Sequence, residues 1–163
     1  MANDNFGASV VLSKNGMVVG IGELNSKTGN TGTFDRHYGH VQIFEWNGNE
    51  WTQRGSPITG DAKCDFLSSF GGLAINTTGS TVVVGAATHD GSGGRNQGQA
   101  QVFDWKGSSW IQQVEDLLGK EEGDWFGASM NIDGLGDTVV LLVRCLITAM
   151  AYDKDPSGSI PVS

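Results

Sequence analysis

The C-terminal tail of this sequence carries oxygen-bearing residues of the kind that bind calcium. Asp153, Asp155 and Ser157 occupy the spacing of positions 1, 3 and 5 in an EF-hand loop. The acidic residue required at position 12 would fall one residue beyond the end of the sequence, and Pro156 fits such a loop poorly. We therefore expect a polar loop between strands here and no metal site, with these three residues as the alternative calcium ligands.

Three histidines form the other group with metal-binding chemistry. His37 and His40 are three residues apart, and His89 lies in a corresponding loop further along the chain. Neutral imidazoles could share a metal ion, but no pattern of nearby carboxylates or thiols completes a ligand set. We expect three exposed loop histidines.

The sequence contains no recognisable set of catalytic residues and no cofactor motif. It has neither a Gly-x-Ser-x-Gly nucleophile turn nor a Cys–His signature. The carboxylates Asp116, Glu121 and Glu122 lie in a charged connection between strands. The prediction is a protein that is not an enzyme. A hydrolase or lyase is the alternative, and it would need carboxylates or histidines that converge on one rim of the fold.

Composition favours a protein made of many short strands. The chain has 163 residues, 25 of them glycine, and glycine is costly inside helices but favourable in turns. Hydrophobic residues make up 38% of the chain, which is enough to bury a core. The net charge of −8 argues against nucleic acid as a partner, since phosphate binding needs a basic surface.

Neither a signal peptide nor a membrane helix is evident in the sequence. The longest apolar run, residues 138–151, contains Arg144 and is shorter than the ~20 residues of a membrane span. We expect no membrane insertion, and an extracellular or cell-surface location if the chain belongs to a longer exported protein. Cys64 and Cys145 are read as two unrelated thiols, with a disulfide between them as the alternative.

The strongest signal in the sequence is an internal repeat. Residues Gly39–Trp51 match Gly98–Trp110 at an offset of 59, without a gap. Asp4–Ser9 match Asp124–Ser129 at an offset of 120, which is two periods. A repeat of about 60 residues indicates an array of similar structural units. The predicted units are residues 1–63, residues 64–123 and a partial, divergent third unit, residues 124–163.

Each unit is predicted to form four antiparallel strands, at Phe6–Ser13, Met17–Gly22, Gly39–Trp46 and Glu50–Arg54 in the first copy. Asn and Gly between the first two strands accept the positive φ of a hairpin turn.

The third strand of the unit predicts how the sheets pack. Val41 and Ile43 point to one face while Phe44 and Trp46 point to the other, so both faces are apolar. Each sheet is therefore expected to lie between two neighbours, as in an all-β, β-propeller fold. The chain would supply about two and a half four-stranded antiparallel blades. Four of the five tryptophans recur at the repeat offset, which favours a place in the core over a sugar-binding role.

These units resemble the FG-GAP repeats of integrin-α-type β-propellers. The resemblance rests on Phe6–Val10, Phe126–Met130 and Val82–Ala86. Gly39–Gln53 and Gly98–Gln112 have the form seen in microbial and algal versions of the repeat. The resemblance implies a propeller that binds partners, commonly in adhesion or recognition outside the cell, and that has no catalytic activity of its own.

Two departures from the family pattern affect what the resemblance implies. The calcium loop that integrin repeats insert between the first two strands is replaced here by short turns, in which Asp133 is at most the single carboxylate. Calcium needs six to eight oxygen ligands, so these turns are expected to be metal-free. The third copy also loses the motif after Val140.

Taken together, the sequence predicts a non-catalytic binding or recognition module. Its loops at Glu23–Tyr38 and Ala87–Gln97 differ between copies and are the candidate contacts for a protein or glycan ligand. Apolar faces at the two ends of the array also predict further blades or self-association. The alternative to a binding module is a truncated structural remnant without activity of its own.

Overall fold

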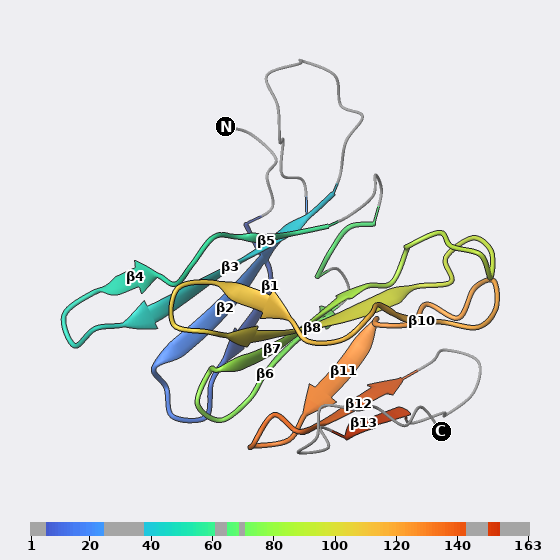
Figure 1. The fold of residues 1–163 in the computed structure, drawn as a ribbon. Helices are drawn as coiled ribbons and strands as arrows, with labels where there is room; N and C mark the ends of the chain where they lie inside the picture. Colours follow the sequence, from blue (N-terminus) through green and yellow to red (C-terminus); the bar gives the residue numbers. More distant parts are fainter. Residues whose placement is uncertain (1–5, 25–37, 61–64, 69–70, 143–149, 154–163) are drawn as a thin grey trace, which may run out of the picture.

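The computed structural model describes residues 6–24, 38–60, 65–68, 71–142 and 150–153. These residues form three antiparallel sheets that follow one another along the chain (Figure 1). The first sheet contains β1 (Phe6–Leu12), β2 (Val18–Glu23), β3 (His40–Trp46), β4 (Trp51–Gln53) and β5 (Ile58–Thr59). The second contains β6 (Leu73–Ile75), β7 (Thr81–Ala86), β8 (Gln99–Trp105), β9 (Trp110–Gln112) and β10 (Leu117–Leu118). The third contains β11 (Ser129–Ile132), β12 (Thr138–Leu142) and β13 (Met150–Asp153).

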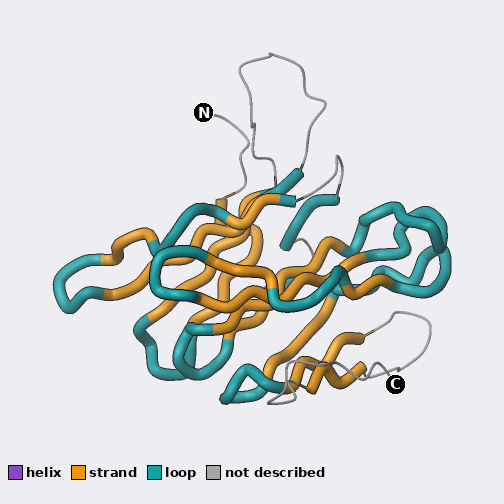
Figure 2. The backbone as a smooth tube through the Cα atoms, in the orientation of Figure 1, coloured by secondary structure: helices purple, strands orange, loops and turns teal. Residues whose placement is uncertain are grey.

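Strands and their connections account for the described chain (Figure 2). Among the described residues, none belongs to a helix of the length and apolar character needed to cross a membrane. The prediction of an all-β propeller-like architecture is confirmed.

The first two strands of every sheet are joined by a hairpin turn with the same design. A polar side chain at the start of the turn accepts a hydrogen bond from the backbone N–H that begins the next strand. Ser13 Oγ accepts from Val18 at 2.9 Å, Asn76 Oδ1 from Thr81 at 3.1 Å and Asp133 Oδ1 from Thr138 at 3.0 Å. Three different side chains therefore do the same work at equivalent positions of the repeat.

The fourth strand of the unit differs from the prediction, because it is split into two short pieces. β4 pairs with the C-terminal half of β3, and β5 pairs with its N-terminal half. β9 and β10 share β8 in the same way. Gly55, with a φ of +79°, and Pro57 lie between the two pieces in the first sheet, and both residue types interrupt a regular strand.

The second sheet lies between the other two, as the apolar character of both strand faces predicts. One apolar cluster joins its Leu73, Val82 and Val84 to Val41 and Ile43 of the first sheet. A second cluster joins its opposite face to the third sheet, through these buried residues: Ala74, Val83, Ala100, Val102, Phe126, Val139 and Leu141. The sheets approach each other through their first strands, since β1 contacts β6 and β6 contacts β11. In Figure 1 the second sheet accordingly lies between the blue-to-cyan first sheet and the orange-to-red third sheet.

The third unit keeps the register of the repeat further than its sequence indicates. β13 pairs with β12 so that Tyr152 lies opposite Val139, just as Phe103 lies opposite Val82 in the second sheet. Asp153 is likewise opposite Thr138, where the second sheet pairs Asp104 with Thr81. The segment that follows the loss of the sequence motif therefore still supplies a third strand.

Candidate functional site

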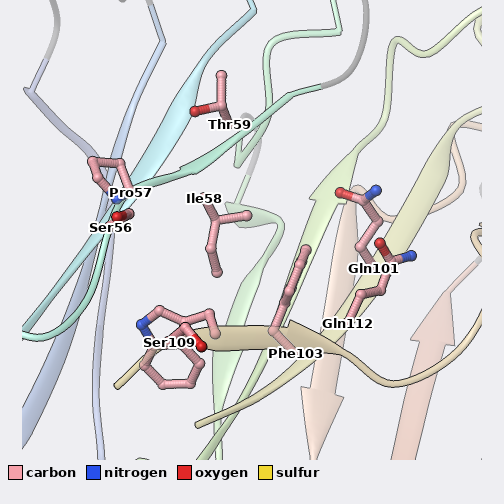
Figure 3. A pocket seen from close by; sticks show the side chains of 9 residues that line it. Ser56, Pro57, Ile58, Thr59, Gln101, Phe103, Ser109 and Gln112 are labelled. Atoms are coloured by element: carbon pink, nitrogen blue, oxygen red, sulfur yellow. The ribbon is translucent and has the colours of Figure 1, made fainter. Parts of the chain in front are cut away.

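A groove between the first two sheets combines aromatic, aliphatic and amide side chains. It has a volume of about 280 Å³. Ser56, Pro57, Ile58 and Thr59 form the side that belongs to the first sheet, whereas Gln101, Phe103, Ser109, Trp110 and Gln112 form the side that belongs to the second. Figure 3 shows Gln101 and Gln112 side by side on the wall across from Ile58. None of the lining side chains carries a formal charge, so the groove suits a neutral, polar ligand.

Two glutamine amides on this wall are held by one carboxylate outside it. Asp116 Oδ1 accepts hydrogen bonds from Gln101 Nε2 at 2.9 Å and from Gln112 Nε2 at 2.8 Å. Gln112 Nε2 also donates to the backbone oxygen of Val114 at 2.9 Å. An amide nitrogen has two protons, so the exposed side chain of Gln112 offers a ligand only its carbonyl oxygen as an acceptor.

Trp110, one of the residues that line the groove, is held by contacts with both sheets. Its indole Nε1 donates to the backbone oxygen of Arg54 at 2.8 Å, and its ring lies 5.3 Å from that of Trp105. The Arg54 guanidinium lies 5.0 Å from the Trp105 ring and 5.8 Å from the Trp110 ring, within range of cation–π attraction. Burial between the sheets lowers the pKa of Arg54, and Glu45, 3.6 Å away, opposes that shift.

The first sheet contains the equivalents of two of the residues that line the groove. Trp51 and Gln53 precede Trp110 and Gln112 by 59 residues, and Trp51 is 44% exposed. Gln53 Nε2 donates to the backbone oxygen of Gly55, as Gln112 Nε2 donates to that of Val114. Pro57 stands where the second unit has Asp116, so the carboxylate that holds the glutamines belongs to the second unit.

The tryptophans are less buried than the prediction of a core role requires. Trp46, Trp105, Trp110 and Trp125 are half-buried, and Trp51 is exposed. In each of the first two sheets the two tryptophans of the repeat contact each other with tilted rings: the centroids of Trp46 and Trp51 are 5.6 Å apart, and those of Trp105 and Trp110 are 5.3 Å apart. The prediction of core tryptophans is therefore wrong in its strict form, although the pairing explains why they recur.

The expectation of exposed histidines is also wrong where the structure tests it. His40 begins β3 and lies 2.9 Å from Glu23 Oε2, with both side chains about one-tenth exposed. His89 Nδ1 lies 3.2 Å from Oδ1 of the buried Asp65. Each histidine thus pairs with a carboxylate of its own, and His37 lies outside the described residues.

Of the candidate metal ligands in the tail, only Asp153 lies within the described residues. The backbone of Asp153 belongs to β13, whereas Asp155 and Ser157 lie outside the described residues, as do Cys64 and Cys145. Within the described ranges, no three His, Cys, Asp or Glu residues form a group that could hold a metal ion.

Of the two candidate contact loops, only the second is described along its length. Loop 87–97 is fixed by internal hydrogen bonds, with the backbone N–H of Asn96 donating to Asp90 Oδ1 at 2.8 Å and that of Gly93 to Gln97 Oε1 at 2.9 Å. Gln97 Nε2 in turn donates to the backbone oxygen of Gly119. Neither this loop nor the described ends of loop 23–38 contribute to the lining of the groove.

Asp133 holds the hairpin turn between β11 and β12. Its carboxylate accepts hydrogen bonds from the backbone N–H groups of Leu135, Gly136, Asp137 and Thr138 at 2.8–3.3 Å. These bonds favour the charged form and hold the pKa of Asp133 below its ordinary value.

A pH-dependent contribution to stability follows from the lowered pKa of Asp133. The contribution is complete above the unfolded pKa of about 3.9 and is lost as the pH falls through the lower folded pKa. We expect Asp133→Asn to keep the turn, since Asn76 does so at the equivalent position, and to flatten the fall in melting temperature below pH 4. NMR titration of the Asp133 carboxyl measures its pKa directly. A pKa at or above the ordinary value for aspartate would show that the backbone hydrogen bonds do not stabilise the charged form.

Comparison with known proteins supports the architecture. No protein-family model matches the chain, and no curated protein sequence does. Among solved structures, the chain is similar to a protein from Bacteroides uniformis described as a candidate 6-phosphogluconolactonase, with a TM-score of 0.57 and 11% identity. The match covers 94% of this chain but only 38% of that one. The class of protein is thus one with a β-propeller-like fold, and the likeness shows the fold alone.

Proposed function

We propose that this chain is a non-catalytic recognition module of FG-GAP type that binds a neutral saccharide unit in the groove between its first two sheets. The observation that carries the proposal is that the half-buried Trp110 ring and Gln112 line the same groove. Gln112 Nε2 already donates two hydrogen bonds, so the side chain offers a ligand its carbonyl oxygen as an acceptor. A sugar presents an apolar ring face and hydroxyl donors, which match these two groups. The volume of about 280 Å³ lies just below the ~300–1,000 Å³ usual for small ligands and suits a single sugar ring.

Two further features of the groove support a binding role. Asp116 and the Arg54–Trp105 contact hold its walls before any ligand arrives, which lowers the entropy cost of binding. The absence of formal charge among the lining residues favours neutral sugars over phosphorylated or sulfated ones.

The test uses a panel of neutral hexose disaccharides, with sulfated disaccharides as the charged comparison, titrated against the full chain and followed by tryptophan fluorescence. We expect saturable binding of a neutral member and a 3- to 10-fold weaker Kd in Gln112→Ala, because one hydrogen bond is worth about 0.5–1.5 kcal/mol. Gln53→Ala removes the equivalent side chain of the first sheet and should leave the Kd unchanged. A native chain that binds no member of the panel, or equal losses in the two variants, would refute the proposal.

A further inference from the structure

One face of the first sheet is apolar and exposed. Val10 and Leu12 on β1 are 63% and 57% exposed, although both are branched aliphatic side chains. The register places Val10 opposite Ile21, and Leu12 opposite Val19, which in turn lies opposite Phe44 of β3. These five side chains, Val10, Leu12, Val19, Ile21 and Phe44, form a continuous surface that we call the leading face.

The repeat shows what this surface is built to contact. Leu73 and Ile75 follow Val10 and Leu12 by 63 residues and are only 7% and 9% exposed, while Val82 and Val84, the equivalents of Val19 and Ile21, are fully buried. In the third sheet the equivalents of the last pair, Val139 and Leu141, are also fully buried. The leading face of a sheet is thus covered wherever a sheet precedes it.

The covering surface is the same in both junctions of the chain. The first sheet covers the second with Val11, Val18, Val41 and Ile43, which project from the side opposite the leading face. The second sheet covers the third with Ala74, Val83, Ala100 and Val102 on the corresponding side. We call this side the trailing face. Each junction therefore joins a trailing face to a leading face, always in the same direction.

The chain also presents a trailing face with nothing described over it. On the third sheet, Asn131 and Val140 correspond to Val11 and Gly20 of the first sheet, and both are exposed, Val140 by 38%. Within the described residues, the stack thus exposes a leading face at one end and part of a trailing face at the other, and these are the two kinds of face that pair inside the chain. Association of such ends is head-to-tail, and it ends in a closed ring when the rotation per sheet permits closure.

We infer that two copies of this chain associate head-to-tail, with the trailing face of the third sheet of each copy packed on the leading face of the first sheet of the other. Two copies together supply six sheets, which lies within the 4–8 blades of closed propellers. The inference is independent of the saccharide groove, which lies inside one copy.

Sedimentation velocity of the full chain over a range of concentrations tests the association. We expect a dimer for the native chain. Val10→Asp and Val140→Asp should each weaken the dimer at least 10-fold, since either one places a charge in both junctions. Ile111→Asp is the matched control, because Ile111 is 46% exposed on β9 of the second sheet, which contributes to neither proposed junction, and it should leave the dimer intact.

Mixing the Val10→Asp and Val140→Asp variants distinguishes a head-to-tail dimer from a dimer in which two like faces pair. A mixed dimer has one junction that carries both substitutions and one that carries neither. The mixture should therefore associate more strongly than either variant alone, which also shows that both variants are folded. The inference would be overturned if the native chain were monomeric or if the mixture associated no more strongly than either variant alone. It would also be overturned if Val140→Asp dimerised normally, which is the result expected when two leading faces pair symmetrically.

Discussion

Replacing Phe126 by alanine should lower the free energy of unfolding by about 3–5 kcal/mol, the range seen when a buried phenylalanine is truncated. Phe126 is fully buried and belongs to the cluster between the second and third sheets. Its backbone N–H also donates to the Gln97 backbone oxygen at 3.2 Å, a bond that an alanine at this position keeps, so the variant removes the ring and leaves this backbone contact in place. Urea denaturation followed by tryptophan fluorescence measures the loss.

The repeat supplies an internal control for this substitution. Phe6 occupies the same motif position 120 residues earlier but is 55% exposed. Phe6→Ala should change stability by no more than about 0.5 kcal/mol, because surface substitutions of this kind remove little buried area. Similar losses for Phe6→Ala and Phe126→Ala would mean that the junction between the second and third sheets is not packed as described.

We expect the second large effect at Gly98, a glycine that the repeat places at the start of the third strand. Its φ is +81°, and a Cβ atom added there would lie 2.3 Å from both the backbone nitrogen and the backbone oxygen of Phe126. Gly98→Ala therefore adds steric overlap with the next unit, about 1–3 kcal/mol, to the ~1–2 kcal/mol cost of a left-handed non-glycine residue. The expected loss of about 2–5 kcal/mol is measured by thermal and urea denaturation.

Gly107→Ala separates the two costs. Gly107 has a φ of +86°, but an added Cβ atom would meet nothing within 4 Å. This variant should lose only the ~1–2 kcal/mol of backbone strain. If Gly98→Ala were no more destabilising than Gly107→Ala, the close approach of the two units at Phe126 would be disproved.

The strands, and the packing of each sheet between its neighbours, could be predicted because both depend on patterns within short stretches of the sequence. Alternating apolar residues on β3 specify two buried faces, and the repeat offset specifies how many times the unit recurs. The split of the fourth strand was not predicted. The residues that interrupt the strand, Gly55 with its positive φ and Pro57, are close in sequence. The two pieces can be recognised as parts of one strand only from the structure, in which both pair with β3.

The groove and the histidine pairs were missed because they join residues distant in sequence. Asp65 precedes His89 by 24 residues, and the groove combines residues 56–59 with residues from the following unit. Gln53 and Gln112 look equivalent in the sequence, yet among the described residues it is Gln112 that faces a preceding sheet, across the groove. The one local signal was the presence of Asp116 where the first unit has Pro57.

The interrupted fourth strand also affects how these sheets meet other chains. An uninterrupted outer strand would display a row of free backbone N–H and C=O groups, a template for the strand addition that leads to fibrils. Here the outermost pairing is divided between pieces of three and two residues, with a glycine of positive φ and a proline between them in the first sheet. The outer edges of the first two sheets therefore resist growth by backbone pairing, even though the leading face of the first sheet is apolar and exposed.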